Sequence, residues 1–413
     1  MNVADYIHDM AVKARAAAGE LAKLTTAEKN AALAAIAERL EADAAAIKAA
    51  NAIDVANAKA AGLKDAMVDR LTLTDARFKS MVEGVRHIIS LPDPVGEDLW
   101  TRTRPSGIEI RKVRVPFGVV AVVFESRPNV FIDTAALCLK TGNAIILRGG
   151  KEAIESNKAL AKSVSAALGA LGSESADANG TLKTLKDAIQ LVEILEHEAV
   201  SELVRSVGLI DVAIPRGGER LIRAMCEAAL IPVLKHYKGV CHIYVDDEAD
   251  LEMALNILDN AKTQRPGVCN AAECLLINRR IEPAFRPKVE AWAKAKGVTL
   301  HENEAGTEYL SLDINVAVVD DCRAAIDFIN ANSSHHSDCI VTANAAKAKE
   351  FLRDVDSSCV YHNVSTRFTD GGEFGMGAEI GISTDKLHAR GPMGLEELTT
   401  YKYTITGNGI VRN

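Results

Sequence analysis

The sequence predicts an α/β protein whose strands form parallel sheets. Two continuous apolar runs, at 119–124 and 143–147, are each followed by a stretch with helical periodicity. Strands that are apolar along their whole length are typical of a parallel sheet with helices on both faces. The same alternation of strands and helices resumes after residue 240, which predicts a second α/β unit over about 240–365.

Composition and charge exclude several classes of protein. The chain has 413 residues, of which 48% are hydrophobic and 25% are charged, so it can bury more than one sizeable core. No apolar run approaches the roughly 20 residues of a membrane-spanning helix, and the first residues lack a signal-peptide pattern. The net charge of -8 disfavours nonspecific binding of nucleic acid. We therefore expect a cytoplasmic protein that binds neither nucleic acid nor a membrane.

The first hundred residues are rich in alanine and are expected to be helical. Thr25 and Glu28 have the spacing of a capping box, in which each side chain satisfies the backbone N–H of the other residue. Apolar residues recur at helical spacing from Leu33 to Ile47, and Gly62 can end this helix. The pattern predicts an amphipathic helix that packs on a domain.

Further short strands are expected along the chain, with helices between them. These strands are 189–192, 212–214, 241–245 and 273–278. Leu251, Leu255 and Leu258 indicate a helix, and the polar segment 172–180 predicts an exposed loop. The β-rich segment 399–405 has nothing after it to pack against, so we expect it to pair with a partner subunit.

Cys269 has the most informative setting among the eight cysteines. Pro266 and Gly267 stand just before it, and the segment lies between a predicted helix and a predicted strand. A cysteine on such a turn is accessible to a substrate, and its thiolate is a strong nucleophile. The alternative is a small core residue on a turn, an interpretation that also fits Cys274. Neither the cysteines nor the histidines have the spacing of a metal site, so no metal is expected.

Two glycine pairs follow predicted strands and precede predicted helices. One pair lies within Arg148–Lys151 and the other within Pro215–Glu219. Glycine lets an anion approach the backbone, and a helix N-terminus favours negative charge. Neither segment is a G-x-G-x-x-G fingerprint, so each alone is also compatible with a simple turn. Two such turns in successive α/β units favour a nucleotide site.

Three other segments carry residues that suit ligand binding in α/β proteins. Segment 125–129 follows a buried strand, at the carboxyl edge of the predicted sheet. Arg367 could hold a carboxylate or a phosphate through two N–H groups. Segment 371–381 contains enough glycine to bend sharply or to let another group come close. Exposed loop residues are the alternative interpretation for each segment.

Taken in order, these segments resemble one family. The stretches that carry the resemblance are VPFGVVAVVFESRPNV, GNAIILRGGKEA, IPRGGERLI, RPGVCNAAECLLIN, NVSTRFTDGGEFGMGAEIGIST and KLHARGPMGLEELTTYKY. They are similar to the γ-glutamyl phosphate reductases, also called glutamate-5-semialdehyde dehydrogenases, of the aldehyde dehydrogenase superfamily. The resemblance implies NADPH-dependent reduction of L-glutamate 5-phosphate to L-glutamate 5-semialdehyde with release of phosphate, the second step of proline synthesis.

By this resemblance Cys269 is the nucleophile. A thiolate displaces phosphate from the acyl phosphate, hydride reduces the resulting thioester, and the thiohemiacetal collapses to the aldehyde. The oxyanion would be held by the Cys269 backbone N–H and by a side chain of segment 125–129, either Asn129 or Arg127. Lys235 stands where hydrolytic relatives carry the glutamate that activates water, which favours phosphate-linked reduction over oxidation to a free acid.

The resemblance also assigns cofactor loops. The segment that would bind the adenine ribose comprises Arg148, Gly149, Gly150 and Lys151. A cation replaces the glutamate of NAD-using relatives there and suits a 2′-phosphate, so NADPH is expected over NADH. The segment that would lie along the pyrophosphate comprises Pro215, Arg216, Gly217 and Gly218. Glu308 resembles the family glutamate on the nicotinamide ribose.

The substrate carries a phosphate and an α-carboxylate as anionic groups. The residues implied for substrate binding are Arg127, Ser365, Thr366 and Arg367. Which arginine takes which anion is open. Glutamate 5-kinase, which makes the substrate, is implied as a partner for channelling.

The implied fold is aldehyde dehydrogenase-like and has three parts. A Rossmann-type NADP-binding domain would take 1–100 and 115–238, with a return after about 367. The α/β catalytic domain would span 240–365. Strands from 100–114 and 396–410 would form a small β extension for oligomerisation, which implies a homo-oligomer.

Other functions remain open on the sequence alone. A related reductase could act on a different acyl phosphate or aldehyde, although Lys235 and the stretches ESRPNV and STRFTDGG argue against it. A cysteine acyltransferase or hydrolase would need no nicotinamide, and hence no glycine loops at 149–150 and 217–218. A non-catalytic nucleotide-binding protein would leave Cys269 dispensable.

Overall fold

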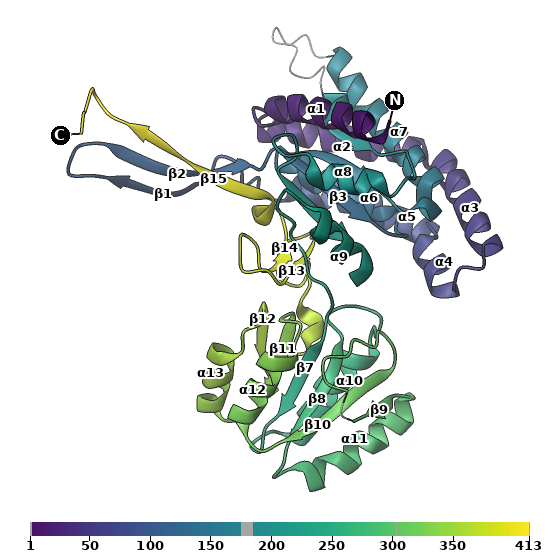
Figure 1. Ribbon diagram of the computed structural model, residues 1–413, viewed down its shortest axis with the longest axis vertical. Coiled ribbons are helices and arrows are strands. Elements are labelled where there is room, and N and C mark those ends of the chain that lie inside the picture. Colours follow the sequence, from purple (N-terminus) through teal and green to yellow (C-terminus); the bar gives the residue numbers. More distant parts are fainter. Residues whose placement is uncertain (1, 175–184, 303, 413) are drawn as a thin grey trace. The chain divides into compact units, whose positions relative to one another are not determined.

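The computed structural model describes residues 2–174, 185–302 and 304–412 and forms two compact units (Figure 1). The larger unit comprises Met1–Leu234, Met376–Gly381 and Met393–Asn413. The smaller unit comprises Lys235–Gly375 and Ile382–Pro392. Along the chain, the smaller unit is therefore an insertion in the larger one.

A four-stranded parallel sheet forms the centre of the larger unit. Its strands, in the spatial order β5-β4-β3-β6, are β3 (Val119–Phe124), β4 (Ala144–Arg148), β5 (Ile189–Leu191) and β6 (Val212–Arg216). Every residue of β3 and β4 is buried, as expected for strands covered on both faces. Because the strands are parallel, β3, β4 and β6 all end at the same edge of the sheet, which is where ligands bind in such folds.

Nine α-helices belong to the described part of the larger unit. They are α1 (Val3–Leu21), α2 (Thr26–Ala42), α3 (Ala44–Ala60), α4 (Asp65–Leu71), α5 (Asp75–Ser90), α6 (Asn129–Lys140), α7 (Ile154–Glu174), α8 (Glu198–Arg205) and α9 (Glu219–Ala228). A short 3₁₀ helix, η1 (Lys151–Ala153), precedes α7. Of the predicted loop 172–180, residues 172–174 belong to α7 and residues 175–180 lie outside the described residues.

The capping box at the start of α2 is confirmed, but the helix that follows is shorter than predicted. Thr25 accepts a hydrogen bond from the backbone of Glu28, whose side chain accepts one from the backbone of Thr25. The prediction of one helix as far as Gly62 is wrong, since the chain breaks at Asp43. The Asp43 carboxylate accepts from Ser163 over 2.7 Å. An aspartate whose carboxylate forms such a bond is better suited to a helix end than to a helix interior.

A three-stranded antiparallel ribbon extends from the larger unit (Figure 1). Its strands are β1 (Asp98–Thr103), β2 (Glu109–Pro116) and β15 (Thr399–Thr406), with β2 in the middle. Side chains of β15 are largely exposed, including Tyr401, Tyr403 and Ile405. The segments 100–114 and 396–410, predicted as a β extension, thus contain strands that pair with one another.

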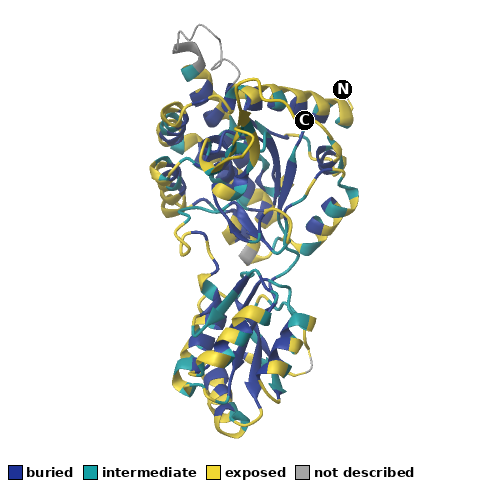
Figure 2. Ribbon diagram, turned by 90° about the vertical axis from the view of Figure 1, so that its left-hand side faces the viewer, coloured by how far each residue is buried: buried dark blue, intermediate teal, exposed yellow. Residues whose placement is uncertain are grey.

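The smaller unit contains a six-stranded parallel sheet in the order β12-β11-β7-β8-β10-β9. The strands are β7 (Cys241–Val245), β8 (Ala272–Asn278), β9 (Thr299–His301), β10 (Asp313–Val319), β11 (Ser337–Val341) and β12 (Cys359–His362). Its helices are α10 (Leu251–Thr263), α11 (Glu282–Lys296), α12 (Cys322–Asn332) and α13 (Ala345–Asp354). Separate apolar clusters lie on the two faces of this sheet and bury the central strands β7, β8, β10 and β11 (Figure 2).

The chain re-enters the larger unit at Met376, whereas the predicted return point is about 367. Hydrogen bonds hold the intervening residues in the smaller unit. The Thr366 hydroxyl, in the 3₁₀ helix η3 (Thr366–Phe368), donates to the Asn270 carbonyl over 2.7 Å. The Asn270 amide donates to the Thr369 carbonyl over 2.8 Å. These two bonds place the segment after β12 against the turn that precedes β8.

Short elements complete the described chain. They are β13 (Gly381–Ser383), β14 (Gly391–Met393) and the 3₁₀ helix η4 (Glu396–Leu398), and β13 pairs with β14. In the glycine-rich segment 371–381, Gly375 and Gly377 have φ of 75° each, a conformation that side chains disfavour. An added Cβ at Gly377 would also lie 2.6 Å from Leu91. Across the residues described, no helix is both long and apolar enough to cross a bilayer.

Candidate active site

Cys269 lies on the turn between α10 and β8, where its side chain is partly exposed. The structure describes all eight cysteines, and none forms a disulfide. Six of them are buried, and only Cys226 and Cys269 are partly accessible. Cys274 is buried on β8, as the alternative of a small core residue requires. Accessibility on a tight turn therefore distinguishes Cys269 as the candidate nucleophile of the smaller unit.

A close approach of two backbones holds this turn. Gly239 lies so near Cys269 that an added Cβ would overlap the Cys269 carbonyl group, so only glycine fits at this position. The buried Cys241 thiol donates to the same carbonyl oxygen over 3.2 Å. The position of Cys269 is therefore set by the loop before β7 as well as by its own turn.

Glu308 lies beside this contact. Its Oε1 accepts a hydrogen bond from the Gly239 N–H over 2.7 Å. A carboxylate held by a backbone N–H is fixed in orientation. Glu308 thus binds Gly239, which in turn lies against the Cys269 backbone. The predicted role of Glu308 on the nicotinamide ribose stays a prediction.

Two histidines that the sequence does not single out lie next to the candidate nucleophile. One ring nitrogen each of His236 and His336 lies within 4.8 Å of the other and of the Cys269 Sγ. The three residues are far apart in the chain, so no local spacing connects them. His236 stands shortly before the predicted strand 241–245, whereas the strand that follows His336 was not predicted, so the sequence gives no signal for the pair.

Lys235 forms an ion pair with Asp385 over 3.0 Å. Both residues belong to the smaller unit, and both side chains are partly buried. An ammonium group in an ion pair cannot act as a base toward water. The structure therefore gives this position no water-activating group.

The predicted substrate residues of segment 365–367 differ in how accessible their side chains are. Thr366 is fully buried, and its hydroxyl supports the turn through the Asn270 carbonyl, so its role as a substrate ligand stays a prediction. Ser365 is also buried, and its Oγ accepts from the Arg367 N–H over 3.3 Å. Hydroxyls that are buried and bonded to the backbone serve the local fold.

Arg367 is partly exposed and lies beside the turn of Cys269. Its Nε donates to the Gln264 Oε1 over 3.0 Å, and its Nη1 contacts the Asn270 Oδ1. Burial and the neighbouring cation Arg265 lower the pKa of Arg367. Two guanidinium groups that repel each other favour an anion between them. Arg265, which is exposed, is a second candidate that the sequence analysis missed, although it stands four residues before Cys269.

In the larger unit, the predicted adenine-ribose segment follows β4. Arg148 is only 8% exposed, and its guanidinium donates to the carbonyls of Gly149 (2.9 Å) and Leu195 (3.1 Å). Arg148 thus holds two loops together through its guanidinium, and its role beside the adenine ribose stays a prediction. Lys151 is exposed and, within the described part of the chain, forms no ion pair.

Side chains of the same unit approach both glycines of this segment closely. An added Cβ at Gly149 would overlap the Asn157 amide, and one at Gly150 would overlap the Glu152 carboxylate. The Asn157 side chain is fully buried, and neither of its polar atoms has a partner among the described residues. These contacts are with side chains of the same unit, so the predicted role of the two glycines beside an anion stays a prediction.

The second glycine pair lies between β6 and α9. The Gly218 N–H donates to the Glu125 Oε2 over 3.0 Å, at the N-terminus of α9. An added Cβ at Gly217 would lie 2.7 Å from the Glu125 carboxyl carbon. A carboxylate therefore occupies the position predicted for the pyrophosphate, and it shows that this helix end accepts an anion. Pro215 and Arg216 end β6 beside it.

Segment 125–129 forms a tight loop after β3. Ser126 has a φ of 41°, a strained value for serine, and its N–H and Oγ both donate to Glu152 Oε1, over 2.8 and 2.6 Å. The Arg127 carbonyl accepts from the Val130 N–H, and its side chain is partly buried. The Asn129 amide donates to the Asp133 carboxylate over 2.8 Å.

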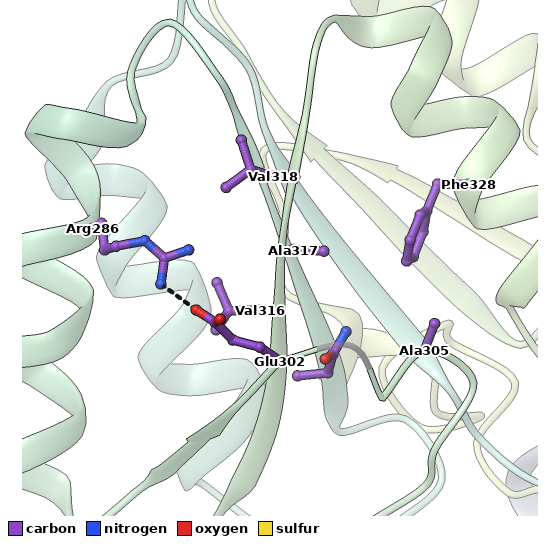
Figure 3. Close-up of a pocket in the computed structure, with 8 residues that line it drawn as sticks. Arg286, Glu302, Ala305, Val316, Ala317, Val318 and Phe328 are labelled. Atoms are coloured by element: carbon purple, nitrogen blue, oxygen red, sulfur yellow. Dashed lines mark hydrogen bonds and ion pairs between the residues drawn. The ribbon is translucent and has the colours of Figure 1, made fainter.

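A hollow of about 460 Å³ lies elsewhere on the smaller unit (Figure 3). It is lined by Arg286, Glu302, Ala305, Asn315, Val316, Ala317, Val318 and Phe328. The Arg286 Nη1 and the Glu302 Oε1 pair across it over 3.1 Å. None of the predicted site residues lines this hollow, so it adds nothing to the candidate active site.

Comparison with known proteins agrees with the fold. A family model described as the aldehyde dehydrogenase family matches residues 2–308. The chain therefore belongs to the aldehyde dehydrogenase family, whose members are oxidoreductases that use NAD or NADP.

Full-length relatives refine the assignment. The gamma-glutamyl phosphate reductase of Moorella thermoacetica is 49% identical over 428 residues, which cover 100% of both chains. That of Aquifex aeolicus is 48% identical and covers 99% of this chain and 97% of its own. The crystal structure of the Thermotoga maritima gamma-glutamyl phosphate reductase matches with a TM-score of 0.94 and 42% identity, over 98% of this chain and 100% of that one. Within its family the chain groups with the γ-glutamyl phosphate reductases, which confirms the resemblance and the predicted fold class.

Proposed function

We propose that this protein reduces L-glutamate 5-phosphate to L-glutamate 5-semialdehyde with NADPH and releases phosphate, the second step of proline synthesis. The full-length relatives that carry the name gamma-glutamyl phosphate reductase support this activity. The observation that carries the proposal in this chain is the partly exposed Cys269 on the turn after α10. Such a nucleophile can displace phosphate from an acyl phosphate, and the resulting thioester holds the acyl carbon in the site and still accepts hydride.

In the proposed reaction the Cys269 thiolate attacks the acyl carbon. A carbon–sulfur bond forms while the bond from the acyl carbon to the phosphate oxygen breaks, and phosphate leaves. NADPH, when bound, supplies the hydride for reduction of the thioester. The sulfur then departs with the electron pair of the carbon–sulfur bond, and the aldehyde is released with Cys269 again a thiolate.

Charge develops on the carbonyl oxygen during the attack. The backbone N–H of Cys269 is one proposed donor to it. The Asn129 amide is the second proposed donor to this oxygen. One of its two N–H groups binds Asp133, and the second can donate to the substrate. Arg127 is kept as the alternative donor. Arg367 and the adjacent Arg265 are proposed for the phosphate or the α-carboxylate of the substrate.

The residues of the larger unit fit a dinucleotide phosphate. Gly149 and Gly150 follow the end of β4, and Lys151 beside them is exposed without an ion pair in the described residues. At the start of α9, the Gly218 N–H already binds a carboxylate. Lys151 would hold the 2′-phosphate, and Gly217 and Gly218 would face the pyrophosphate once Glu125 turns away.

A homo-oligomer is proposed on the basis of the β ribbon. Tyr401, Tyr403 and Ile405 are about half exposed on β15 (48%, 52% and 62%) and share one face, because they alternate along the strand. The Lys112 ammonium lies 3.5 Å from the centre of the Tyr401 ring. An exposed aromatic face of this kind is typical of a subunit interface. Since an acyl phosphate hydrolyses readily, glutamate 5-kinase is the proposed partner that would deliver it.

The decisive experiment measures the reverse reaction with Cys269→Ala. The wild-type protein should reduce NADP⁺ with the semialdehyde only when phosphate is present, and Cys269→Ala should lose this activity while its far-UV circular dichroism stays unchanged. Cys226→Ser, which changes the other partly accessible cysteine, should keep it. Activity of Cys269→Ala, or wild-type turnover without phosphate, would contradict the mechanism; turnover with a different acyl phosphate only would favour the related reductase.

A further inference from the structure

Three side chains that can bind a metal ion meet at one place in the smaller unit. The Cys269 Sγ and one ring nitrogen each of His236 and His336 lie within 4.8 Å of one another. His236 comes before β7, Cys269 before β8 and His336 before β11. These three strands are neighbours in the order β11-β7-β8, so the cluster gathers at their amino ends. The parallel sheet itself brings the three residues together.

Protein oxygens orient both imidazole rings. The His236 Nδ1 lies 2.8 Å from the Ile382 carbonyl oxygen, which can only accept a hydrogen bond. Nδ1 therefore donates this bond, and Nε2 is the nitrogen that can bind a metal ion. The His336 Nδ1 lies 2.9 Å from the Ser337 hydroxyl. Metal-binding histidines are commonly held in this way through their second nitrogen.

His336 provides an independent indication that a ligand is missing. Its side chain is 0% exposed, and its Nε2 has no hydrogen-bond partner among the residues described. A buried polar atom without a partner costs about 1–3 kcal/mol. A buried ring nitrogen that lacks a partner among the described residues is therefore suited to bind a metal ion.

One thiolate and two imidazoles are donors that zinc prefers. In a tetrahedral site with Zn–S of about 2.3 Å and Zn–N of about 2.0 Å, the ligand atoms lie roughly 3.3–3.5 Å apart. His236 is on a loop and Cys269 is on a turn, so rotation of these side chains can bring the donors from within 4.8 Å to that spacing. Three protein ligands leave the fourth position of the metal open to water or an anion.

We propose that Cys269, His236 and His336 form a Zn²⁺ site that competes with the use of Cys269 as a nucleophile. Binding forms a Zn–S bond in place of the thiol S–H bond, the proton goes to solvent, and no atom changes its oxidation state. The sulfur lone pair is then shared with the metal, so zinc inhibits acyl transfer reversibly. Metal binding itself is independent of the function proposed above.

The test titrates the metal-free, full-length protein with Zn²⁺ against a chromogenic chelator, and with Co²⁺ as a spectroscopic probe. We expect one zinc ion per chain and, with cobalt, the thiolate charge-transfer band and intense visible bands of a tetrahedral site. Cys269→Ser should remove the charge-transfer band. His236→Asn and His336→Asn keep a polar group near the Nδ1 position but lack the second ring nitrogen, and each should weaken zinc binding about tenfold or more.

Two neighbouring residues provide matched controls. His335→Asn changes the histidine adjacent to His336, whose Nδ1 contacts the Asp356 carbonyl. Cys226→Ser changes the other partly accessible thiol. Both should bind zinc like the wild type. If His336→Asn fails to fold by circular dichroism, the loop variant His236→Asn carries the test alone. Unchanged zinc affinity in His236→Asn, or an octahedral cobalt spectrum, would overturn the proposal.

Discussion

Asp133 is an acid whose pKa the fold raises. It lies on α6, where its carboxylate accepts from the Asn129 amide. Burial raises the pKa of Asp133 to about 6, against the opposing effects of the Asn129 hydrogen bond and of Arg216. The folded state therefore holds a proton that the unfolded chain has already lost between the ordinary value of 3.8 and about 6. The stabilisation that comes from this bound proton is complete below pH 3.8 and is lost as the pH rises through about 6.

Asp133→Asn should stabilise the larger unit at neutral pH and not in acid. Asparagine can still accept from Asn129 but carries no charge to bury. We expect the unfolding temperature to rise by roughly 2–4 °C at pH 8, and the gain to vanish near pH 4. Scanning calorimetry at several pH values measures this. Asp75→Asn is a control of opposite sign, because the hydrogen bond from Lys48 lowers the pKa of Asp75. A gain that is independent of pH would contradict the assignment.

Lys151 decides between the two nicotinamide cofactors if it holds the 2′-phosphate. Lys151→Glu should raise the KM for NADPH by at least tenfold and leave the KM for NADH nearly unchanged, because only the former carries that phosphate. Steady-state kinetics with each cofactor measures this. Lys158→Glu changes a nearby lysine that lies 3.7 Å from Glu155, and it should alter neither value. Equal losses with both cofactors would remove Lys151 from the site.

At the scale of elements, the loop before β7 and the turn before β8 depend on the absence of a side chain at Gly239. Gly239→Ala forces the two segments apart, because the new Cβ would overlap the Cys269 carbonyl group. We expect kcat to fall at least tenfold, with a lower unfolding temperature of the smaller unit.

The control for Gly239→Ala is Gly19→Ala. Gly19 lies within α1, and an added Cβ there would meet nothing within 4 Å. Alanine should stabilise that helix by about 0.5–1 kcal/mol without changing kcat. Full activity of Gly239→Ala would show that the position of Cys269 tolerates movement of the loop.

How far the sequence predicts an element depends on whether the deciding contacts are local. The strand β3 is predicted within a residue, because all of its residues are apolar and buried. The break at Asp43 is missed, because the hydroxyl of Ser163 that helps to hold it is 120 residues away. The capping box succeeds, because both partners lie within four residues.

The same distinction applies to the candidate site. The turn of Cys269 is visible in the sequence, since proline and glycine stand next to it. The sequence does not show the direction in which a side chain points. For this reason Arg148 and Thr366 were assigned to ligands, although in the structure they bind backbone carbonyls. His236 and His336 were missed, because only the strand order of the folded sheet places them together.

At the scale of the whole molecule, the proposed oligomer predicts a simple outcome for Tyr403→Lys. A charge in the middle of the exposed aromatic face of β15 should dissociate the assembly, because an unpaired buried charge is costly at an interface. Light scattering coupled to size exclusion at micromolar concentration should then report the monomer mass. Val207→Lys replaces another exposed apolar residue, 65% accessible, and should keep the assembly intact. An unchanged mass for Tyr403→Lys would remove the ribbon from the interface.

The pairing of β2 with β15 also orders events during synthesis. Arg114 and Thr399 contact each other across 285 positions of the chain. The hairpin β1–β2 therefore leaves the ribosome long before its third strand, while the inserted smaller unit is complete earlier than the unit that surrounds it. Until β15 arrives, one edge of β2 is unsatisfied on every nascent chain of a polysome. Strand edges of this kind aggregate, so translation pauses late in the message should make this protein depend on chaperones.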